Sequence, residues 1–275
     1  MSDSHAPRTA SQRIGWTATV VGAGLVFFFL MAPILAIVPL SFSSSTYLTY
    51  PLPGLSLRWY EDFLASPKWM LALKNSMIIG VSATFLSMTL GTLAALGLAQ
   101  WKSTFKPLVL AVVLSPMVVP VVIAAVGLYF FFAPLGLTGN YAGLILAHTA
   151  LATPFVVITV SATLQSFDMN LARAAASLGA PPLLVFRKVI LPLILPGMAS
   201  GALFAFATSF DEVVIVLFMA GPEQRTLPRE MFSGIRENIS PTITAVAVIL
   251  TLLSVFLLST LEWLRRRSER LQGKG

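Results

Sequence analysis

The sequence contains no cysteine and few charged residues. Of its 275 residues, 56% are hydrophobic and only 11% are charged. A soluble domain carries about 25% charged residues, so most of this chain cannot face water. The absence of cysteine excludes a disulfide framework and any cysteine-based metal site. The two histidines, His5 and His148, lie far apart in the sequence, and we therefore expect no metal site.

Common catalytic and nucleotide-binding motifs are also missing. The sequence has no Gly-x-x-x-x-Gly-Lys-Ser/Thr motif, whose glycine-rich loop would cradle the phosphates of a nucleotide. The zinc-protease motif His-Glu-x-x-His and the nucleophile motif Gly-x-Ser-x-Gly are absent too. We therefore expect neither enzyme activity nor a bound cofactor in this chain. If the protein depends on ATP, another polypeptide must bind it.

Six stretches are long and apolar enough to cross a membrane as helices, since a span needs about 20 apolar residues. They are Gly15–Leu40, Ala72–Ala99, Leu108–Ala133, Ala142–Leu164, Gly197–Ala220 and Thr242–Leu264. The first is longer than the apolar part of a signal peptide, about 7–15 residues, so we expect it to be retained. The pattern predicts an all-α, polytopic membrane protein with about six transmembrane helices over residues 15–264.

The third of these stretches contains Pro116 and Pro120. Proline and glycine are tolerated in spans where neighbouring helices satisfy the freed backbone groups. The prolines could therefore serve ordinary helix packing, or they could break a helix that lines a pore. The sequence alone leaves both interpretations open.

The net charge of +7 would suggest nucleic acid in a soluble protein. Here the basic residues cluster in the C-terminal tail and in short loops, which is typical of the positive-inside rule, so no nucleic-acid partner is expected. With a cytoplasmic N-terminus, twelve of the eighteen Lys and Arg residues lie inside and six outside. Residues 1–14 then form a cytoplasmic tail and residues 265–275 a basic cytoplasmic tail, so that both termini are cytoplasmic.

Residues 165–196 form the longest inside segment, and the sequence predicts a short helix within it. Asp168 or Asn170 can cap its first turn, an alanine-rich run follows, and Gly179 is placed to end it before two prolines. Four residues share one apolar face of this helix: Leu171, Ala174, Ala175 and Leu178. A helix of this length needs a partner surface, which could be another protein or the lipid interface.

The same segment resembles the cytoplasmic loop motif of the permease subunits of type I ABC importers. The resemblance rests on Ala174-Ala175-x-x-x-Gly179, followed by Val189-Ile-Leu-Pro192 and Pro196. In that family the loop holds a coupling helix that docks on the ATPase subunit. The family's glutamate position is occupied here by Arg173, which implies a matching acidic site on the ATPase or a dispensable contact. The resemblance implies seven ATPase-coupling residues: Arg173, Ala174, Ala175, Leu178, Gly179, Leu191 and Pro192.

The resemblance extends over nearly the whole chain. Lys74-Asn75-Ser76, at the start of the second span, is similar to the beginning of the family's core. The C-terminal third is similar to a narrower group, the polyamine and opine permeases. That similarity rests on Phe210-Asp-Glu-Val, Gly221-Pro222, Thr226-Leu-Pro228 and Asn238-Ile-Ser-Pro241.

Asp211 and Glu212 interrupt the apolar run of the predicted fifth span. A carboxylate at membrane depth is costly and is a functional-site hypothesis by default. The two acids could attract a cationic solute, or they could pair with an arginine of a neighbouring helix or of a partner permease. Successive residues of a helix point about 100° apart, so we expect only one of them to face the path.

The resemblance implies a subunit of the bacterial inner membrane that forms half of a translocation path for a small cationic solute, polyamine or opine-like. Its implied partners are an ATPase dimer that binds ATP and Mg, a second permease of different sequence, and a soluble binding protein. An ion-coupled secondary transporter or channel subunit remains the alternative. The near absence of ionisable residues from the other spans weighs against that alternative.

Overall fold

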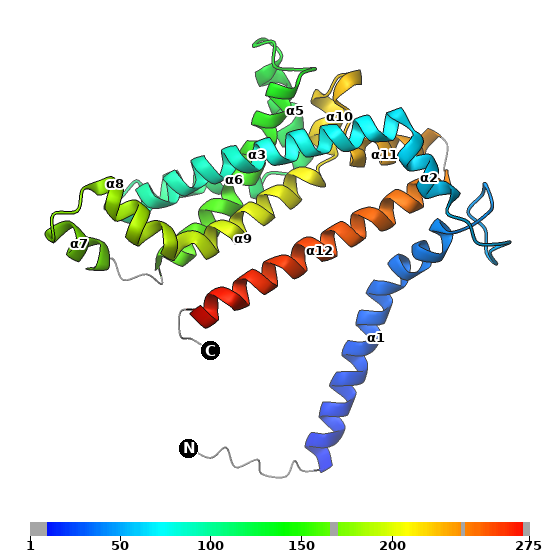
Figure 1. Cartoon of the computed structure of the whole chain (residues 1–275), viewed down its shortest axis with the longest axis horizontal. Helices are drawn as coiled ribbons and strands as arrows, with labels where there is room; N and C mark the ends of the chain where they lie inside the picture. Colours follow the sequence, from blue (N-terminus) through cyan, green and yellow to red (C-terminus); the bar gives the residue numbers. More distant parts are fainter. Residues whose placement is uncertain (1–9, 166–169, 238–239, 272–275) are drawn as a thin grey trace.

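The computed structural model describes residues 10–165, 170–237 and 240–271. The regular structure of these residues is helical, apart from one isolated β-bridge between Ser43 and Leu55. This confirms the all-α prediction. The helices lie mostly along one axis of an elongated molecule (Figure 1).

The spanning helices largely follow the predicted stretches. Five helices in the described part of the chain are long and apolar enough to cross a membrane: Ile14–Ser41, Pro67–Gln100, Tyr141–Gln165, Pro182–Phe210 and Pro241–Thr260. A sixth candidate is a pair of helices, Lys106–Met117 and Val121–Phe132, bent by 102° at the break between them. The structure thus has five spans, or six when the bent pair is one span.

The bend lies at the two prolines of the third predicted stretch. Helix α4 (Lys106–Leu114) runs into the 3-10 turn Ser115–Met117, and α5 begins at Val121. Neither Pro116 nor Pro120 has an N–H to donate to the preceding turn. The helix is therefore broken at these residues, as in one of the two interpretations that the sequence left open. Helix α5 stands away from the long axis of the molecule (Figure 1).

The core of the molecule is built from α3 (Pro67–Gln100), α6 (Tyr141–Gln165) and α9 (Leu191–Phe210), which make the most extensive helix contacts. Glycine lets their backbones approach closely. A Cβ atom at Gly91 of α3 would lie 2.7 Å from the Cβ of Val156 in α6. Ten buried residues, here called the α6–α9 cluster, fill this region: Ala95, Ala152, Val156, Val160, Leu164, Ala172, Val185, Ile190, Ile194 and Ala205.

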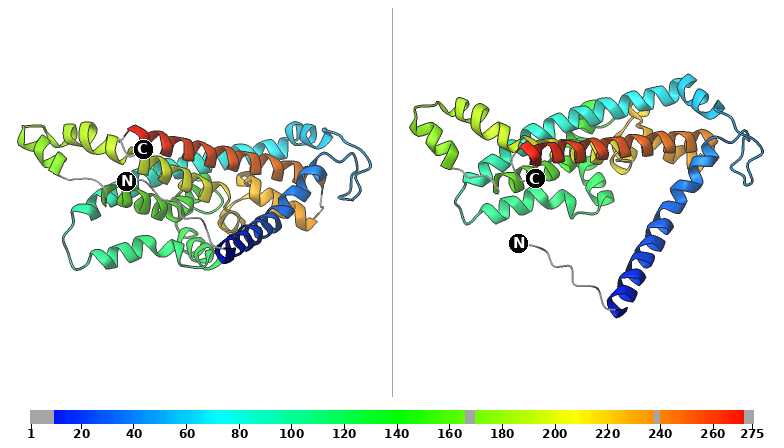
Figure 2. Two further views of the ribbon diagram at one scale, coloured as in Figure 1. Left: turned by 90° about the horizontal axis from the view of Figure 1, so that it is seen from below. Right: turned by 60° about the horizontal axis from the view of Figure 1, so that its bottom comes forward.

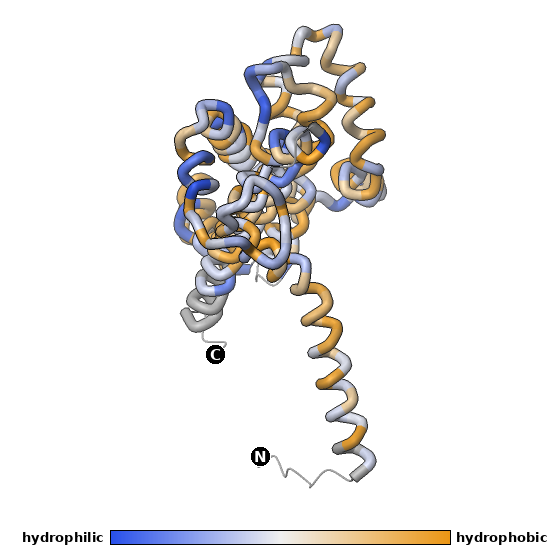
Figure 3. The backbone as a smooth tube through the Cα atoms, turned by 90° about the vertical axis from the view of Figure 1, so that its right-hand side faces the viewer, coloured by the Kyte–Doolittle hydropathy of each residue, from blue (hydrophilic) through white to orange (hydrophobic). Residues whose placement is uncertain are grey.

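Helix α1 (Ala10–Ser41) diverges from this core. It points away from the other helices (Figures 1 and 3), and none of its most apolar 18-residue window is buried. Its end is fastened to α2 (Arg58–Ala65) by two hydrogen bonds. The hydroxyls of Ser41 and Tyr60 lie 2.7 Å apart, and Trp59 Nε1 donates to the Ser43 carbonyl at 2.7 Å.

The predicted fifth span, residues 197–220, is wrong at both ends. The helix starts with α8 (Pro182–Val185), passes through a π-helical turn (Phe186–Ile190) and continues as α9 to Phe210. In the turn, the Leu191 N–H reaches back five residues to the Phe186 carbonyl. The ring of Pro192 has no N–H to bond the preceding turn, which explains the wider winding. Beyond Phe210 the chain breaks, and α10 (Val214–Met219) is a separate helix.

The remaining short helices lie at the two ends of the molecule. Helix α7 (Asn170–Ser177) and α8 are at one end of the long axis, and α2 and α11 (Leu227–Glu237) are at the other (Figures 1 and 2). Helix α12 (Pro241–Leu271) runs back from the α2 end towards the α7 end (Figure 1). The parts with candidate functional roles are therefore separated along the axis.

Candidate functional site

Helix α7 has the predicted position and the predicted end. Gly179 has φ +85°, a conformation that costs little only for glycine. Its N–H donates to the Ala176 carbonyl at 2.9 Å, and the Ala180 N–H donates to the Ala175 carbonyl at 3.2 Å. This pair of bonds is a Schellman motif, which closes the C-terminus of the helix. Of the two predicted capping residues, Asp168 lies outside the described residues, and α7 begins at Asn170.

The predicted apolar face of α7 is divided in the structure. Ala172 belongs to the α6–α9 cluster, and Ala175 packs against it. Leu171 and Leu178 are 53% and 89% exposed, and Ala174 is exposed as well. The sequence pointed to another protein or the lipid interface as the partner surface of this helix, but part of that surface lies within its own loop, because α7 contacts α8 and the π-helical turn. The small side chains of the alanines allow this close packing, and the side chains of the two leucines remain exposed.

The other predicted coupling residues lie at the same end of the molecule. Arg173 is exposed, and its Nη1 donates to Asn170 Oδ1 at 3.5 Å within the helix. Leu191 is half-buried and Pro192 is exposed in the first turn of α9, directly after the π-helical turn that α7 contacts. The fold therefore gathers the seven residues into one region that carries exposed leucine and arginine side chains.

Asp211 and Glu212 lie at the break between α9 and α10, not inside a continuous helix. Asp211 is the C-cap of α9 and is exposed. No residue in the described ranges makes a hydrogen bond or ion pair with its carboxylate. Glu212 is half-buried, and its Oε1 accepts a hydrogen bond from the Ile215 N–H at 2.9 Å. The two acids therefore differ: one carboxylate is engaged by the backbone and the other is free.

Both acids line a cavity of about 550 Å³ between α9 and α12. The other lining residues are mostly apolar: Leu203, Phe204, Phe206, Ala207, Thr208, Phe210, Pro228, Leu250, Leu253, Ser254, Leu257 and Leu258. The rings of Phe206 and Phe210 are stacked, with centroids 5.2 Å apart and an interplanar angle of 24°. A carboxylate beside apolar walls and aromatic rings is suited to bind an organic cation.

A buried hydrogen bond fixes the last turn of α9 just before this cavity. His148 of α6 is 1% exposed and Ser209 is 5% exposed. His148 Nδ1 lies 2.8 Å from Ser209 Oγ and 3.1 Å from the Ser209 carbonyl oxygen. A carbonyl can only accept, so Nδ1 carries the proton in its bond to that oxygen. No sequence pattern indicates this pairing, because 61 residues separate the two side chains.

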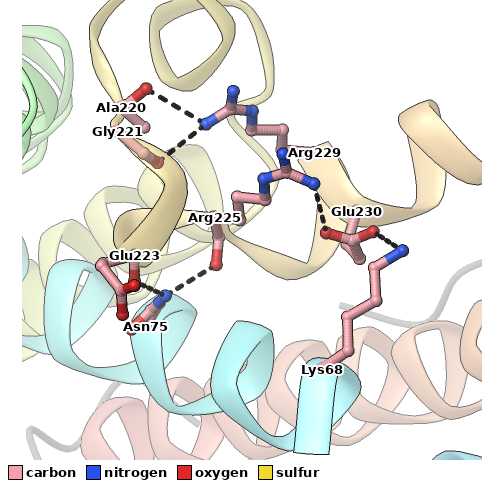
Figure 4. A network of polar contacts seen from close by, with 8 residues as sticks. All are labelled: Lys68, Asn75, Ala220, Gly221, Glu223, Arg225, Arg229 and Glu230. Carbon is pink, nitrogen blue, oxygen red and sulfur yellow. Dashed lines mark hydrogen bonds and ion pairs between the residues drawn. The ribbon is translucent and has the colours of Figure 1, made fainter.

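A polar network, missed at the sequence level, fixes the segment after α10 to the start of α3 (Figure 4). The Asn75 carboxamide donates to the carbonyls of Glu223 and Arg225, both at 2.8 Å. Its Oδ1 accepts from the Tyr141 hydroxyl at 2.7 Å. Ser76 Oγ accepts from the Leu227 N–H at 2.9 Å. The Asn75-Ser76 pair thus holds a loop that lies about 150 residues further along the chain.

Charged side chains surround Glu230 in the same network. Glu230 is 1% exposed, is paired with Lys68 and has Arg225 Nη1 at 3.7 Å from Oε2. Arg229 points the other way, and its Nη1 donates to the carbonyls of Ala220 and Gly221 at 3.2 and 3.3 Å (Figure 4). Burial, together with the nearby charge of Arg225, lowers the pKa of Arg229, and Glu230 opposes this shift. A buried carboxylate with two cationic partners ties α11 to α3.

Solved structures share this fold. The chain superposes with a TM-score of 0.72 on a chain of a bacterial ABC transporter involved in the import of the acidic polysaccharide alginate, at 16% identity, covering 95% of this chain and 99% of that one. A structure of the alginate transporter with its oligosaccharide-bound periplasmic protein gives a TM-score of 0.71 at 16% identity, covering 96% and 97% of the two chains. At this level of identity the similarity shows a shared fold.

Sequence comparison gives the family. Residues 87–270 match the binding-protein-dependent transport system inner membrane component. The chain belongs to this family: it is an inner-membrane permease subunit of an ABC importer, as its motifs indicated. This finding does not favour the alternative of an ion-coupled carrier. A permease subunit of this family works with a binding protein and with the other components of an ABC importer, and these are the general kinds of partner expected for this chain.

Among the curated relatives are two polyamine permeases. The spermidine/putrescine transport system permease protein PotC of Shigella flexneri is 31% identical over 251 residues, covering 91% of this chain and 94% of that protein. The putrescine transport system permease protein PotI of Escherichia coli K12 is 34% identical over 249 residues, covering 86% of each. The resemblance to polyamine permeases is thereby confirmed.

Proposed function

We propose that this subunit forms half of the translocation path for a small cationic solute, a polyamine or an opine-like amine. The observation that carries the proposal is the free carboxylate of Asp211, which lines an otherwise mainly apolar cavity. An unpaired carboxylate in such surroundings is costly. It would offset the hydration that an ammonium group loses on entering the path.

The relatives support the same class of solute. PotC and PotI are permeases of spermidine/putrescine and putrescine systems, and both substrates are flexible alkyl amines. The stacked rings of Phe206 and Phe210 would add a favourable surface for the cation and its hydrocarbon chain. The binding should be weak, because a tight site would slow release.

We further propose that α7 couples the subunit to a separate ATPase dimer. Leu171 and Leu178 of α7 are exposed, and α7 lies at one end of the long axis of the molecule (Figure 1). The two leucines would offer an apolar surface to a second chain. Arg173 would face an acidic or polar patch of that ATPase. ATP and Mg would be bound by the ATPase, and this chain would carry out no catalysis of its own. The second permease would be a different chain, and both termini would be cytoplasmic.

The solute path is tested with Asp211→Asn in the complete transporter. Uptake per assembled complex should fall about tenfold or more, since a hydrogen bond to a charged group is worth about 1.5–3 kcal/mol. Membrane abundance should stay unchanged. Glu61→Gln removes an exposed carboxylate of α2, outside the cavity, and is the matched control that should transport normally. Reduced abundance with normal transport per complex would instead assign Asp211 a structural role.

A further inference from the structure

The break between α9 and α10 is held on both sides of Asp211. Before it, Ser209 is bonded to the buried His148 of α6. After it, the Glu212 carboxylate accepts from the Ile215 N–H. Ile215 itself is 0% exposed and is packed with buried residues of α3, α5 and α6. The backbone around Asp211 is therefore fixed, and of the two carboxylates at the break only that of Asp211 has no hydrogen bond from the described residues.

Glu212 acts on the backbone in the manner of a helix cap. Its side chain accepts from an amide three residues further on, in the first turn of α10, which would otherwise lack a partner. This bond needs an oxygen that accepts, and a carboxamide oxygen can accept it too, in a weaker bond than that of a carboxylate. The charge of Glu212 is consequently not needed for the role its geometry assigns.

We propose that Glu212 is a positioning residue: it fixes the break so that the carboxylate of Asp211 stays in the cavity, and it does not itself bind the solute. The inference rests on the proposed function, since it assigns the solute's ammonium group to Asp211. It also separates the contributions of the two acids, because the carboxylate of Asp211 is offered to an ammonium group and that of Glu212 is bonded to the backbone.

The inference is tested with putrescine uptake in proteoliposomes that contain the complete transporter, purified through a tag on this chain and normalised to the assembled complex. Glu212→Gln keeps the acceptor and loses the charge, so uptake should stay within about twofold of the unmodified transporter. Glu212→Ala loses the acceptor, and uptake should fall by about fivefold. Retention of function in the glutamine variant is the signature of a cap rather than of a charge.

A double variant shows whether Glu212 acts through Asp211. Combining Asp211→Asn with Glu212→Ala should reduce uptake little further than Asp211→Asn alone, because residues that act as a unit give non-additive losses. Losses that multiply would overturn the inference, and so would a Glu212→Gln variant as impaired as Asp211→Asn. Full uptake in Glu212→Ala would overturn it too. Should Glu212→Ala fail to assemble, the glutamine variant decides alone: near-normal uptake upholds the inference and a tenfold loss overturns it.

The proposed function and this inference fail in different ways. If Asp211→Asn keeps full putrescine uptake, the assignment of the cation path to Asp211 is wrong. If Asp211→Asn loses uptake and Glu212→Gln loses it equally, the path stands and the positioning role of Glu212 is wrong.

Discussion

Adjacent residues of this chain have different contacts because their backbone surroundings differ. Asp211 ends α9 with a free carboxylate, whereas Glu212 bonds the first turn of α10. The sequence predicted that only one of the two acids faces the path but could not say which. The answer depends on where the helix breaks, and hydropathy cannot locate that break because apolar residues lie on both sides of it.

The proposed coupling role of α7 can be tested at Gly179. Gly179→Val should impair transport while the subunit still reaches the membrane, because a left-handed backbone costs a non-glycine residue about 1–2 kcal/mol. Gly97→Val is the matched control: at both glycines a Cβ would meet nothing within 4 Å, and Gly97 lies within helix α3, without positive φ. Stimulation of the ATPase by the binding protein should fall in the Gly179 variant alone. Normal transport in both variants would refute the coupling role of α7.

For the helices, the sequence predicted the features that follow from local residue patterns. Apolar runs predicted the spans, and the alanine-rich segment with Gly179 predicted α7. Contacts between distant segments could not be predicted this way. Asn75 bonds carbonyls 148 and 150 residues away. Helix α7 packs against α8 and the π-helical turn, with Ala172 buried in the α6–α9 cluster. A periodicity argument identifies an apolar face but does not say which part of it the chain itself covers.

The hydrogen bonds of Asn75 lead to a prediction for the loop that joins α10 and α11. Asn75→Leu removes both donors to the loop that joins α10 and α11 and leaves the Glu223 and Arg225 carbonyls without these partners. Each lost partner costs about 1–3 kcal/mol, so hydrogen exchange in residues 221–228 should be about tenfold faster or more. Asn140→Leu is the control, because Asn140 caps the start of α6 and should change exchange there instead. Unchanged exchange in residues 221–228 of the Asn75 variant would show that this network does not hold the loop.

Helix α7 lies at the opposite end of the molecule's long axis from α2 and α11 (Figure 1). Since the sequence has no cysteine, single cysteines can be introduced without removing others. An impermeant maleimide should label Thr46→Cys, in the loop after α1, from outside the cell. Thr104→Cys, between α3 and α4, and Ser177→Cys, in α7, should be labelled after permeabilisation. All three residues are exposed. Labelling of Ser177→Cys from outside would contradict cytoplasmic termini and a cytoplasmic coupling helix.

The most direct test of the whole account is the energy source of transport. The complete importer, purified through this subunit, should be reconstituted into proteoliposomes with ATP enclosed on the α7 side. The account predicts putrescine uptake that requires both ATP and the binding protein and that persists when ionophores remove every ion gradient. Uptake that proceeds without ATP and stops when a proton or sodium gradient is removed would contradict it.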